Sequence, residues 1–230
     1  IPLPIWIKKI FLTRRQRNGY TIGDGITKEN FKTIEADFLK LLENLSNIFK
    51  KRKFLFGNRP SIADIGFSGP FFRHFALDPV PLEIIRQKAP NVLSWVSNLW
   101  NARVSKIDED FEEGIPKDLE PLFREIGKVY LPYLSANVDA VKQRKTKFDF
   151  KFGNVYLKNA RYSLYRVWCL KELRDRFTKL SEEDKTQVEI LLKEFGCWEP
   201  LWRDKNLPLM DNQEEELPFR ADRKMLGVNE

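Results

Sequence analysis

Ten residues, Phe56 to Ile65, constrain the fold of this 230-residue chain more than any other segment, because they specify how a helix begins. Ser61 is a preferred N-cap residue, and Asp64 stands three residues later, where its carboxylate reaches back to the cap amide. Pro60 and Ile65 flank this box as a hydrophobic staple would. We therefore expect a structural cap at Ser61 and Asp64, and a helix whose start is buried rather than frayed.

Apolar residues recur at three-and-four spacing through most of the chain, which is typical of helices with one apolar face. The boxed helix should run from Ser61 to about Ala76, and Pro70 inside it should bend the helix or remove one of its bonds. Near the middle of the second half the period changes to two, on both sides of Gly153-Asn154. That alternation predicts a β-hairpin at residues 148–157.

These patterns predict a mainly α fold in four segments. The acidic stretch between about residues 105 and 118 is the best internal boundary, and prolines recur from Pro200 onward. The segments are a helical bundle at 1–105, an acidic loop at 106–118, a helical extension with the β-hairpin at 119–199, and an irregular tail at 200–230. The chain opens with Ile1 and no Met, so we expect that the natural protein has residues upstream of it.

The chain has a net charge of +7, from 40 Lys and Arg against 33 Asp and Glu. A positive balance favours an acidic partner: nucleic acid, anionic lipid, or an anionic ligand such as glutathione. The simpler alternative is that these residues form solvated helix faces. Nucleic acid is the least favoured partner because no recognition motif is present. No apolar run reaches the ~20 residues that a membrane-spanning helix needs, so we expect a soluble chain without a transmembrane segment.

Cysteine and histidine are too few for metal binding. Cys169 and Cys197 are the only cysteines and His74 is the only histidine, so no metal site is expected. Isolated cysteines in apolar surroundings are typical of buried free thiols, which suits an intracellular protein, cytoplasmic or mitochondrial. A disulfide between the two stays open. Their apolar neighbours should also raise the thiol pKa, which argues against either as a nucleophile.

The stretch FLFGNRPSIADIGFSGPFFRH, residues 54–74, resembles the N-cap box and hydrophobic staple in the C-terminal helical domain of glutathione S-transferases. Residues 89–96, APNVLSWV, are similar to the P-x-V-x-x-W helix of that domain. The resemblance covers roughly residues 1–105. It continues more loosely as the long C-terminal extension of a bacterial-type glutathione transferase-like group, and so implies a transferase C-terminal-like helical bundle.

In this family an N-terminal thioredoxin-like domain holds most of the glutathione and supplies the catalytic Tyr, Ser or Cys. Its pattern does not occur in this sequence, so no catalytic residue is expected here. Glutathione is then a possible cofactor of the full-length protein, and no cofactor is expected for this chain alone. The resemblance implies that the chain is the helical acceptor-substrate half of a transferase-like protein. The alternative is a non-catalytic helical adaptor or scaffold subunit in a larger assembly.

The resemblance also suggests substrate-binding residues. Arg14 and Arg15, with the neighbouring Arg17, would supply charge near a thiolate or grip the carboxylates of glutathione. The alternative for them is a solvated helix end. Phe11 and Tyr20 would line the acceptor pocket. Phe71, His74 and Phe75 would lie on the helix beneath the cleft. The alternative for these five residues is ordinary structural packing. The expected partners are an N-terminal thioredoxin-like domain or a partner subunit, with a homodimer or larger assembly left open.

Overall fold

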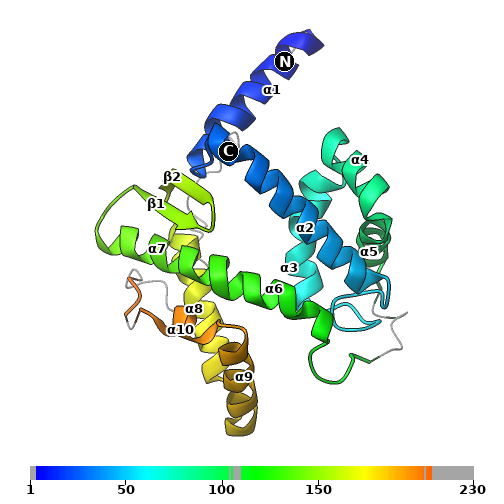
Figure 1. Cartoon of the computed structure of the whole chain (residues 1–230), viewed down its shortest axis with the longest axis vertical. Helices are drawn as coiled ribbons and strands as arrows, with labels where there is room; N and C mark the ends of the chain where they lie inside the picture. Colours follow the sequence, from blue (N-terminus) through cyan, green and yellow to red (C-terminus); the bar gives the residue numbers. More distant parts are fainter. Residues whose placement is uncertain (1–3, 104, 106–109, 205, 209–230) are drawn as a thin grey trace, which may run out of the picture. The chain divides into compact units, whose positions relative to one another are not determined.

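The computed structural model describes residues 4–103, 105, 110–204 and 206–208 (Figure 1). Within these ranges the chain is mainly helical and contains one two-stranded antiparallel sheet, so the predicted mainly α fold with a single hairpin is confirmed. Parts of three predicted segments lie outside the described residues: 1–3 and 104 of the bundle, 106–109 of the acidic loop, and 205 and 209–230 of the tail. No helix in the described part is both long and apolar enough to cross a bilayer.

The chain divides into two compact units. We call Lys32–Phe123 the helical unit, and Ile1–Phe31 together with Arg124–Glu230 the hairpin unit. This division differs from the predicted segments, because the first 31 residues group with the C-terminal half rather than with the bundle that follows them. The reason is a set of hydrogen bonds between the chain at Gly25 and Asn30 and the hairpin, described below.

The helical unit is built from helices around one apolar core. In chain order they are α2 (Phe31–Phe49), α3 (Ile62–Pro70), the π-helical turn η3 (Phe71–Phe75), α4 (Pro79–Lys88), α5 (Pro90–Trp100), the 3-10 turn η5 (Lys117–Leu119) and α6 (Glu120–Glu125). Trp95 of α5 lies at the centre of this core, stacked on Phe49 with ring centroids 4.9 Å apart and edge-on to Phe71 at 5.4 Å. Both Trp95 and Phe71 are almost fully buried.

Asp64 is fully buried at the start of α3, and it accepts four hydrogen bonds. The backbone N–H and the hydroxyl of Ser61 donate to one carboxylate oxygen, at 2.9 and 2.6 Å, and the Asp64 N–H donates back to Ser61 Oγ. Both bonds of the predicted capping box are thus present. The other oxygen receives the Leu55 N–H and Trp95 Nε1–H, each at 2.9 Å. Asp64 therefore ties α5 and the preceding loop to the cap.

Pro70 ends α3, and the chain continues as the π-helical turn η3 rather than as a regular helix. Proline has no N–H to donate and its ring crowds the preceding turn, so the regular ladder of bonds is interrupted there. The Ala76 N–H accordingly donates to the carbonyl of Phe71, five residues back, at 3.0 Å. The predicted disturbance of the helix at Pro70 takes this form.

A second buried charge fixes the loop after α2. Arg52 binds Asp118 through both terminal guanidinium nitrogens, at 3.0 and 2.7 Å, and its Nε donates to the Leu55 carbonyl at 2.9 Å. Lys51 adds a further contact to Asp118 at 3.1 Å. The Arg52 guanidinium beside Asp118 holds the pKa of that carboxyl below its usual range, partly offset by burial.

The hairpin unit has its own core. Its elements are α1 (Ile5–Arg14), the π-helical segment η1 (Arg15–Thr21), the 3-10 turn η2 (Lys28–Asn30), the π-helical turn η6 (Ile126–Tyr130), α7 (Leu131–Lys142), β1 (Lys147–Phe152), β2 (Val155–Arg161), α8 (Leu164–Thr178), α9 (Glu182–Glu194) and α10 (Trp198–Trp202). Leu134, Val138, Val155, Val167 and Leu170 are fully buried here. None of the residues of α1 is buried.

The predicted hairpin is present, and its strands are longer than expected. Lys147 pairs with Arg161, so β1 and β2 extend beyond the predicted range 148–157, and α8 starts at Leu164. The register shifts between Phe148 and Phe150, where Asn159 adopts a positive φ of 55° and donates its N–H to Asp149 at 2.7 Å. This irregularity gives β2 an extra residue relative to β1.

The Asp64 network predicts a large loss of stability in the variant Asp64→Ala. Removing the carboxylate leaves four donors in or near the core without an acceptor, and we expect a loss of about 3 kcal/mol or more in the free energy of unfolding. Asp184 is the matched control: it holds the same position beside the cap residue Ser181 of α9 but is exposed, and Asp184→Ala should lose at most about 1 kcal/mol. Urea denaturation followed by circular dichroism measures both, and equal losses would contradict the central role of Asp64.

The Arg52–Asp118 pair predicts a defined pH dependence. A carboxyl whose pKa is lowered on folding stabilises the protein above its ordinary pKa of 3.8, and that contribution is lost as pH falls below it. Asp118→Asn should therefore cost about 1 to 2 kcal/mol at neutral pH, and the difference from the wild type should shrink below about pH 4. Thermal unfolding at a series of pH values tests this. A difference that stays constant through the acid range would exclude the ion pair as its source.

Candidate anion-binding site

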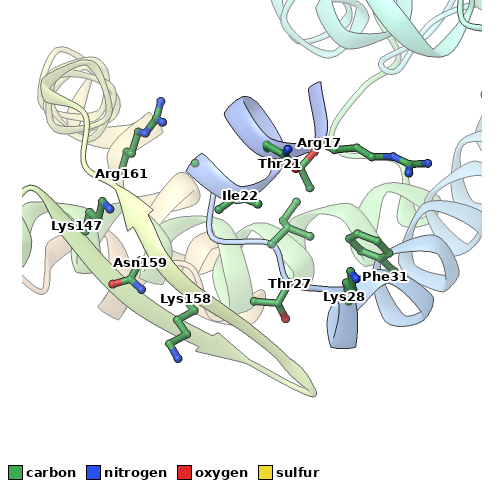
Figure 2. A pocket seen from close by; sticks show the side chains of 13 residues that line it. Arg17, Thr21, Ile22, Thr27, Lys28, Phe31, Lys147, Lys158, Asn159 and Arg161 are labelled. Atoms are coloured by element: carbon green, nitrogen blue, oxygen red, sulfur yellow. The ribbon is translucent and has the colours of Figure 1, made fainter. Parts of the chain in front are cut away.

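The hairpin unit contains a cleft of about 640 Å³ (Figure 2). Three stretches of chain line it: the end of η1 with the turn after it, the loop that leads into α2, and the hairpin. The lining residues are Arg17, Asn18, Thr21, Ile22, Gly23, Ile26, Thr27, Lys28, Phe31, Lys147, Lys158, Asn159 and Arg161. All of them belong to the hairpin unit.

Backbone and amide hydrogen bonds hold the walls of the cleft together. The side-chain amide of Asn30, which is 4% exposed, donates to the Tyr156 carbonyl at 2.7 Å and accepts the Tyr156 N–H at 3.2 Å. The Lys158 N–H donates to the Gly25 carbonyl at 2.8 Å. Gly25 has a φ of 84°, and a Cβ there would lie 3.1 Å from Ala160 and Leu157. Only glycine suits this close approach of the loop to β2.

Five cationic side chains line the cleft, and no acidic side chain does. They come from all three walls: Arg17, Lys28, Lys147, Lys158 and Arg161. None of the five makes an ion pair with a carboxylate of the described residues. Their charge is therefore available to a ligand, and the potential in the cleft is positive.

Two carboxylates lie near this group outside the lining: that of Glu29, which is exposed, and that of Asp149, whose pKa is lowered by the Asn159 N–H, the Tyr156 hydroxyl and the charge of Lys158. The Thr27 hydroxyl beside Glu29 holds the pKa of that carboxyl below its usual range, and the charges of Lys28 and Lys158 act in the same direction. Glu29 therefore stays ionised at neutral pH. These two carboxylates neutralise only part of the charge that five cations bring to the cleft.

The start of a long helical segment adds to the positive potential. Thr27 is the N-cap residue of η2, which continues into α2, and no side-chain bond caps this end. Thr27, Lys28 and Phe31 all line the cleft. Because peptide dipoles align along a helix, its N-terminus carries partial positive charge and favours anions.

Arg161 is held close to the backbone of the opposite wall. A Cβ built on Gly23 would lie 3.0 Å from Arg161 Cζ, so the guanidinium packs against the main chain where a side chain would otherwise stand. Apolar groups complete the lining: Ile22 is 57% exposed and Phe31 44% exposed, with Ile26 half-buried. A ligand that suits both features is an anion with an apolar part.

The predicted site residues near the N-terminus lie outside this lining. Phe11 is exposed on α1, and Arg14 is the last residue of that helix. Arg15 and Tyr20 do come together: Arg15 Nη2 donates to the Tyr20 hydroxyl at 2.8 Å, and the guanidinium carbon lies 5.4 Å from the ring centroid. Of the predicted arginine group, Arg17 is the member that lines the cleft.

The other three predicted residues belong to η3 of the helical unit. Phe71 is 1% exposed and packs on Phe75 and Trp95, which agrees with the packing alternative. Phe75 is half-buried with its ring 4.9 Å from that of Phe38. His74 is exposed, and its Nδ1 lies 3.6 Å from an Asp78 carboxylate oxygen. A substrate-binding role for these residues, as for Phe11, Arg14, Arg15 and Tyr20, stays a prediction.

The hairpin cations and Lys28 were not among the predicted site residues. The alternation at 148–157 predicted the hairpin, and Lys147 belongs to a basic run that is visible in the sequence. No local signal, however, places Lys158 and Arg161 opposite the turn at Gly23. That placement depends on contacts between residues more than a hundred positions apart, such as Asn30 and Tyr156.

Cys169 and Cys197 are free thiols, so the disulfide left open by the sequence does not form. Burial raises the pKa of both thiols, with the Tyr165 hydroxyl partly opposing this at Cys169. A raised pKa keeps a thiol protonated, which disfavours nucleophilic chemistry. Within the described ranges no three His, Cys, Asp or Glu side chains gather as metal ligands.

Residues 26–102, 77 of the 230, match the family described as glutathione S-transferase, C-terminal domain. The matched segment contains α2 to α5 and also the residues just before α2. Four of its residues line the cleft: Ile26, Thr27, Lys28 and Phe31. No curated protein and no solved structure matches the chain significantly.

The variant Asn30→Ala tests how the cleft is held together. Without the amide, the Tyr156 N–H and carbonyl lose their partner across the wall, and we expect faster hydrogen exchange at Tyr156 with a loss of about 2 kcal/mol in stability. The control is Lys32→Ala, at an exposed position two residues further on. Exchange measured by mass spectrometry on peptides from β2 gives the answer, and unchanged protection in Asn30→Ala would refute this link.

Proposed function

Because residues 26–102 belong to the glutathione S-transferase C-terminal domain family, we propose that this chain is the helical acceptor-substrate half of a glutathione transferase-like protein. In this proposal the basic cleft of the hairpin unit holds an anionic acceptor that carries an apolar group. Glutathione is bound mainly by a separate thioredoxin-like domain, either in the same protein or in a partner subunit. That domain also supplies the residue that activates the sulfur.

One observation carries the proposal: five cations and three apolar residues line the cleft, without a single acidic side chain. Glutathione has two carboxylates but also an ammonium group, and such a cation needs a carboxylate or carbonyl partner when it leaves water. The lining gives the ammonium no carboxylate and surrounds it with like charge. An anion without an ammonium group suits the cleft better, which favours the acceptor over glutathione as its ligand.

The buried thiols support the same division of labour. Both Cys169 and Cys197 are held in the protonated form by burial, so neither is prepared for attack on an acceptor. The chemistry that the cleft can contribute is electrostatic: it holds an anionic group and orients the rest of the molecule over Ile22 and Phe31. Binding and orientation of this kind lower the barrier of a reaction whose nucleophile is delivered by another domain.

The alternative is a non-catalytic helical adaptor or scaffold subunit, and one face of the helical unit favours it. Ile62, Ile65 and Trp100 are 70%, 63% and 73% exposed, and Trp100 packs edge-on against Phe72 at 5.3 Å. Gly66 and Gly69, which lie on α3 with Ile62 and Ile65, have open space around them. Contiguous exposed apolar surface is typical of protein contacts. An adaptor of this kind has no need of a ligand in the cleft, so ligand binding distinguishes the two functions.

The proposal predicts that the chain binds the fluorescent anion 8-anilinonaphthalene-1-sulfonate, which combines a negative charge with aromatic rings. We expect the double variant Lys158→Glu/Arg161→Glu to weaken this binding at least about tenfold, because two attractive charges become repulsive. The matched control, Lys128→Glu/Lys179→Glu, makes the same change in net charge at two exposed positions of the hairpin unit outside the cleft. If both variants lose the same affinity for the fluorescent anion, the loss reflects the change in net charge, and the assignment of the cleft as the binding site is contradicted.

Glutathione itself provides the second arm of this experiment. Titrated into the chain in a calorimeter, it should give no detectable binding, because its main site lies on the thioredoxin-like domain. A micromolar dissociation constant would overturn the assignment of glutathione to a separate domain. Absence of binding for both glutathione and the fluorescent anion would instead favour the adaptor.

A further inference from the structure

We infer that the ligand group for which the cleft is built is a phosphate monoester attached to an apolar moiety. This inference rests on the proposed ligand site and names the chemistry that the site selects. It follows from three features of the cleft: the number of unpaired cations, the helix that begins there, and the exposed apolar residues beside them.

The number of cations is the first argument. Arg17, Lys28, Lys147, Lys158 and Arg161 make no ion pair with a carboxylate within the described ranges, so they bring five positive charges to one cleft. The carboxylates of Glu29 and Asp149, outside the lining, offset only part of this charge. A carboxylate or a sulfate ester offsets only one of these charges. A phosphate monoester carries about −1.5 to −2 at pH 7 and offers three acceptor oxygens, so it interacts with several cations at once.

The helix start is the second argument. The helical segment that begins at Lys28 continues through η2 and α2 to Phe49, and Thr27 at its N-cap makes no side-chain capping bond. Figure 2 shows Thr27, Lys28 and Phe31 at this end of the cleft, with the hairpin residues Lys158 and Asn159 on the wall beside them. The positive end of a helix favours a phosphate more than a singly charged anion, because the interaction scales with the charge.

Neutral donors and apolar surface complete the fit. The Asn159 side-chain amide makes no hydrogen bond to other described residues, since it is the backbone N–H that Asp149 binds. This leaves two N–H donors for a phosphate oxygen. Ile22 and Phe31 are more than 40% exposed, and an apolar group of the ligand would remove this surface from water. Inorganic phosphate alone would leave it uncovered.

The test compares two ligands of nearly the same shape, 1-naphthyl phosphate and 1-naphthyl sulfate, which differ in charge at neutral pH. Each displaces the fluorescent anion from the chain, and we expect the phosphate ester to bind at least about tenfold more tightly at about pH 7.5. The preference should shrink toward about pH 5, where the phosphate loses its second charge. In the variant Lys158→Gln/Arg161→Gln the preference should fall, while in Lys128→Gln/Lys179→Gln it should persist.

The outcomes separate this inference from the function on which it rests. Equal affinity for the two esters overturns the phosphate assignment but leaves an anionic ligand site in place. Inorganic phosphate that competes as well as the ester overturns the apolar part. A single-stranded oligonucleotide that binds more tightly than the ester, with strong salt dependence, would replace the small ligand by a polyanion. Failure of both esters and of the fluorescent anion to bind overturns the proposed function as well.

Discussion

The buried carboxylate of Asp64 is the interaction on which the helical unit depends. A fully buried charge persists only where donors surround it, and here the donors come from the loop at Leu55, the cap at Ser61 and the indole of Trp95. The carboxylate thereby sets the distance between α3 and α5. Trp95, once fixed, presents its ring to Phe49 and Phe71, so the apolar core is assembled around a polar centre.

Features specified by local chemistry could be predicted from the sequence. The cap at Ser61 and the interruption at Pro70 need only residues a few positions apart, and the hairpin needs only alternation around a turn. Its strand ends were less predictable, because Lys147 pairs with Arg161 through tertiary contacts that no local pattern encodes. The division into two units could not be predicted from local patterns for the same reason, because it depends on contacts such as the hydrogen bonds between Asn30 and Tyr156, which lie 126 positions apart.

The candidate site shows the same limit. The arginines at positions 14, 15 and 17 form a basic group that is visible in the sequence. Only tertiary structure distinguishes Arg17, in the cleft, from Arg15, which binds Tyr20. Apolar periodicity likewise cannot separate a core residue from a pocket residue, and Phe71 is a core residue. The cations of β2 gain their significance from what lies opposite them.

The cleft is assembled from two stretches of chain, residues 17–31 and 147–161, that lie more than a hundred positions apart, and this has a consequence for the order of events during synthesis. The wall that contains Arg17 and Lys28 leaves the ribosome long before the hairpin with Lys158 and Arg161 is made. Until then Asn30 has no strand to bind, and the entire helical unit is translated in the interval. A ligand that requires both walls can therefore recognise only a chain that has been made beyond the hairpin, and by binding it shifts the folding equilibrium toward the folded hairpin unit.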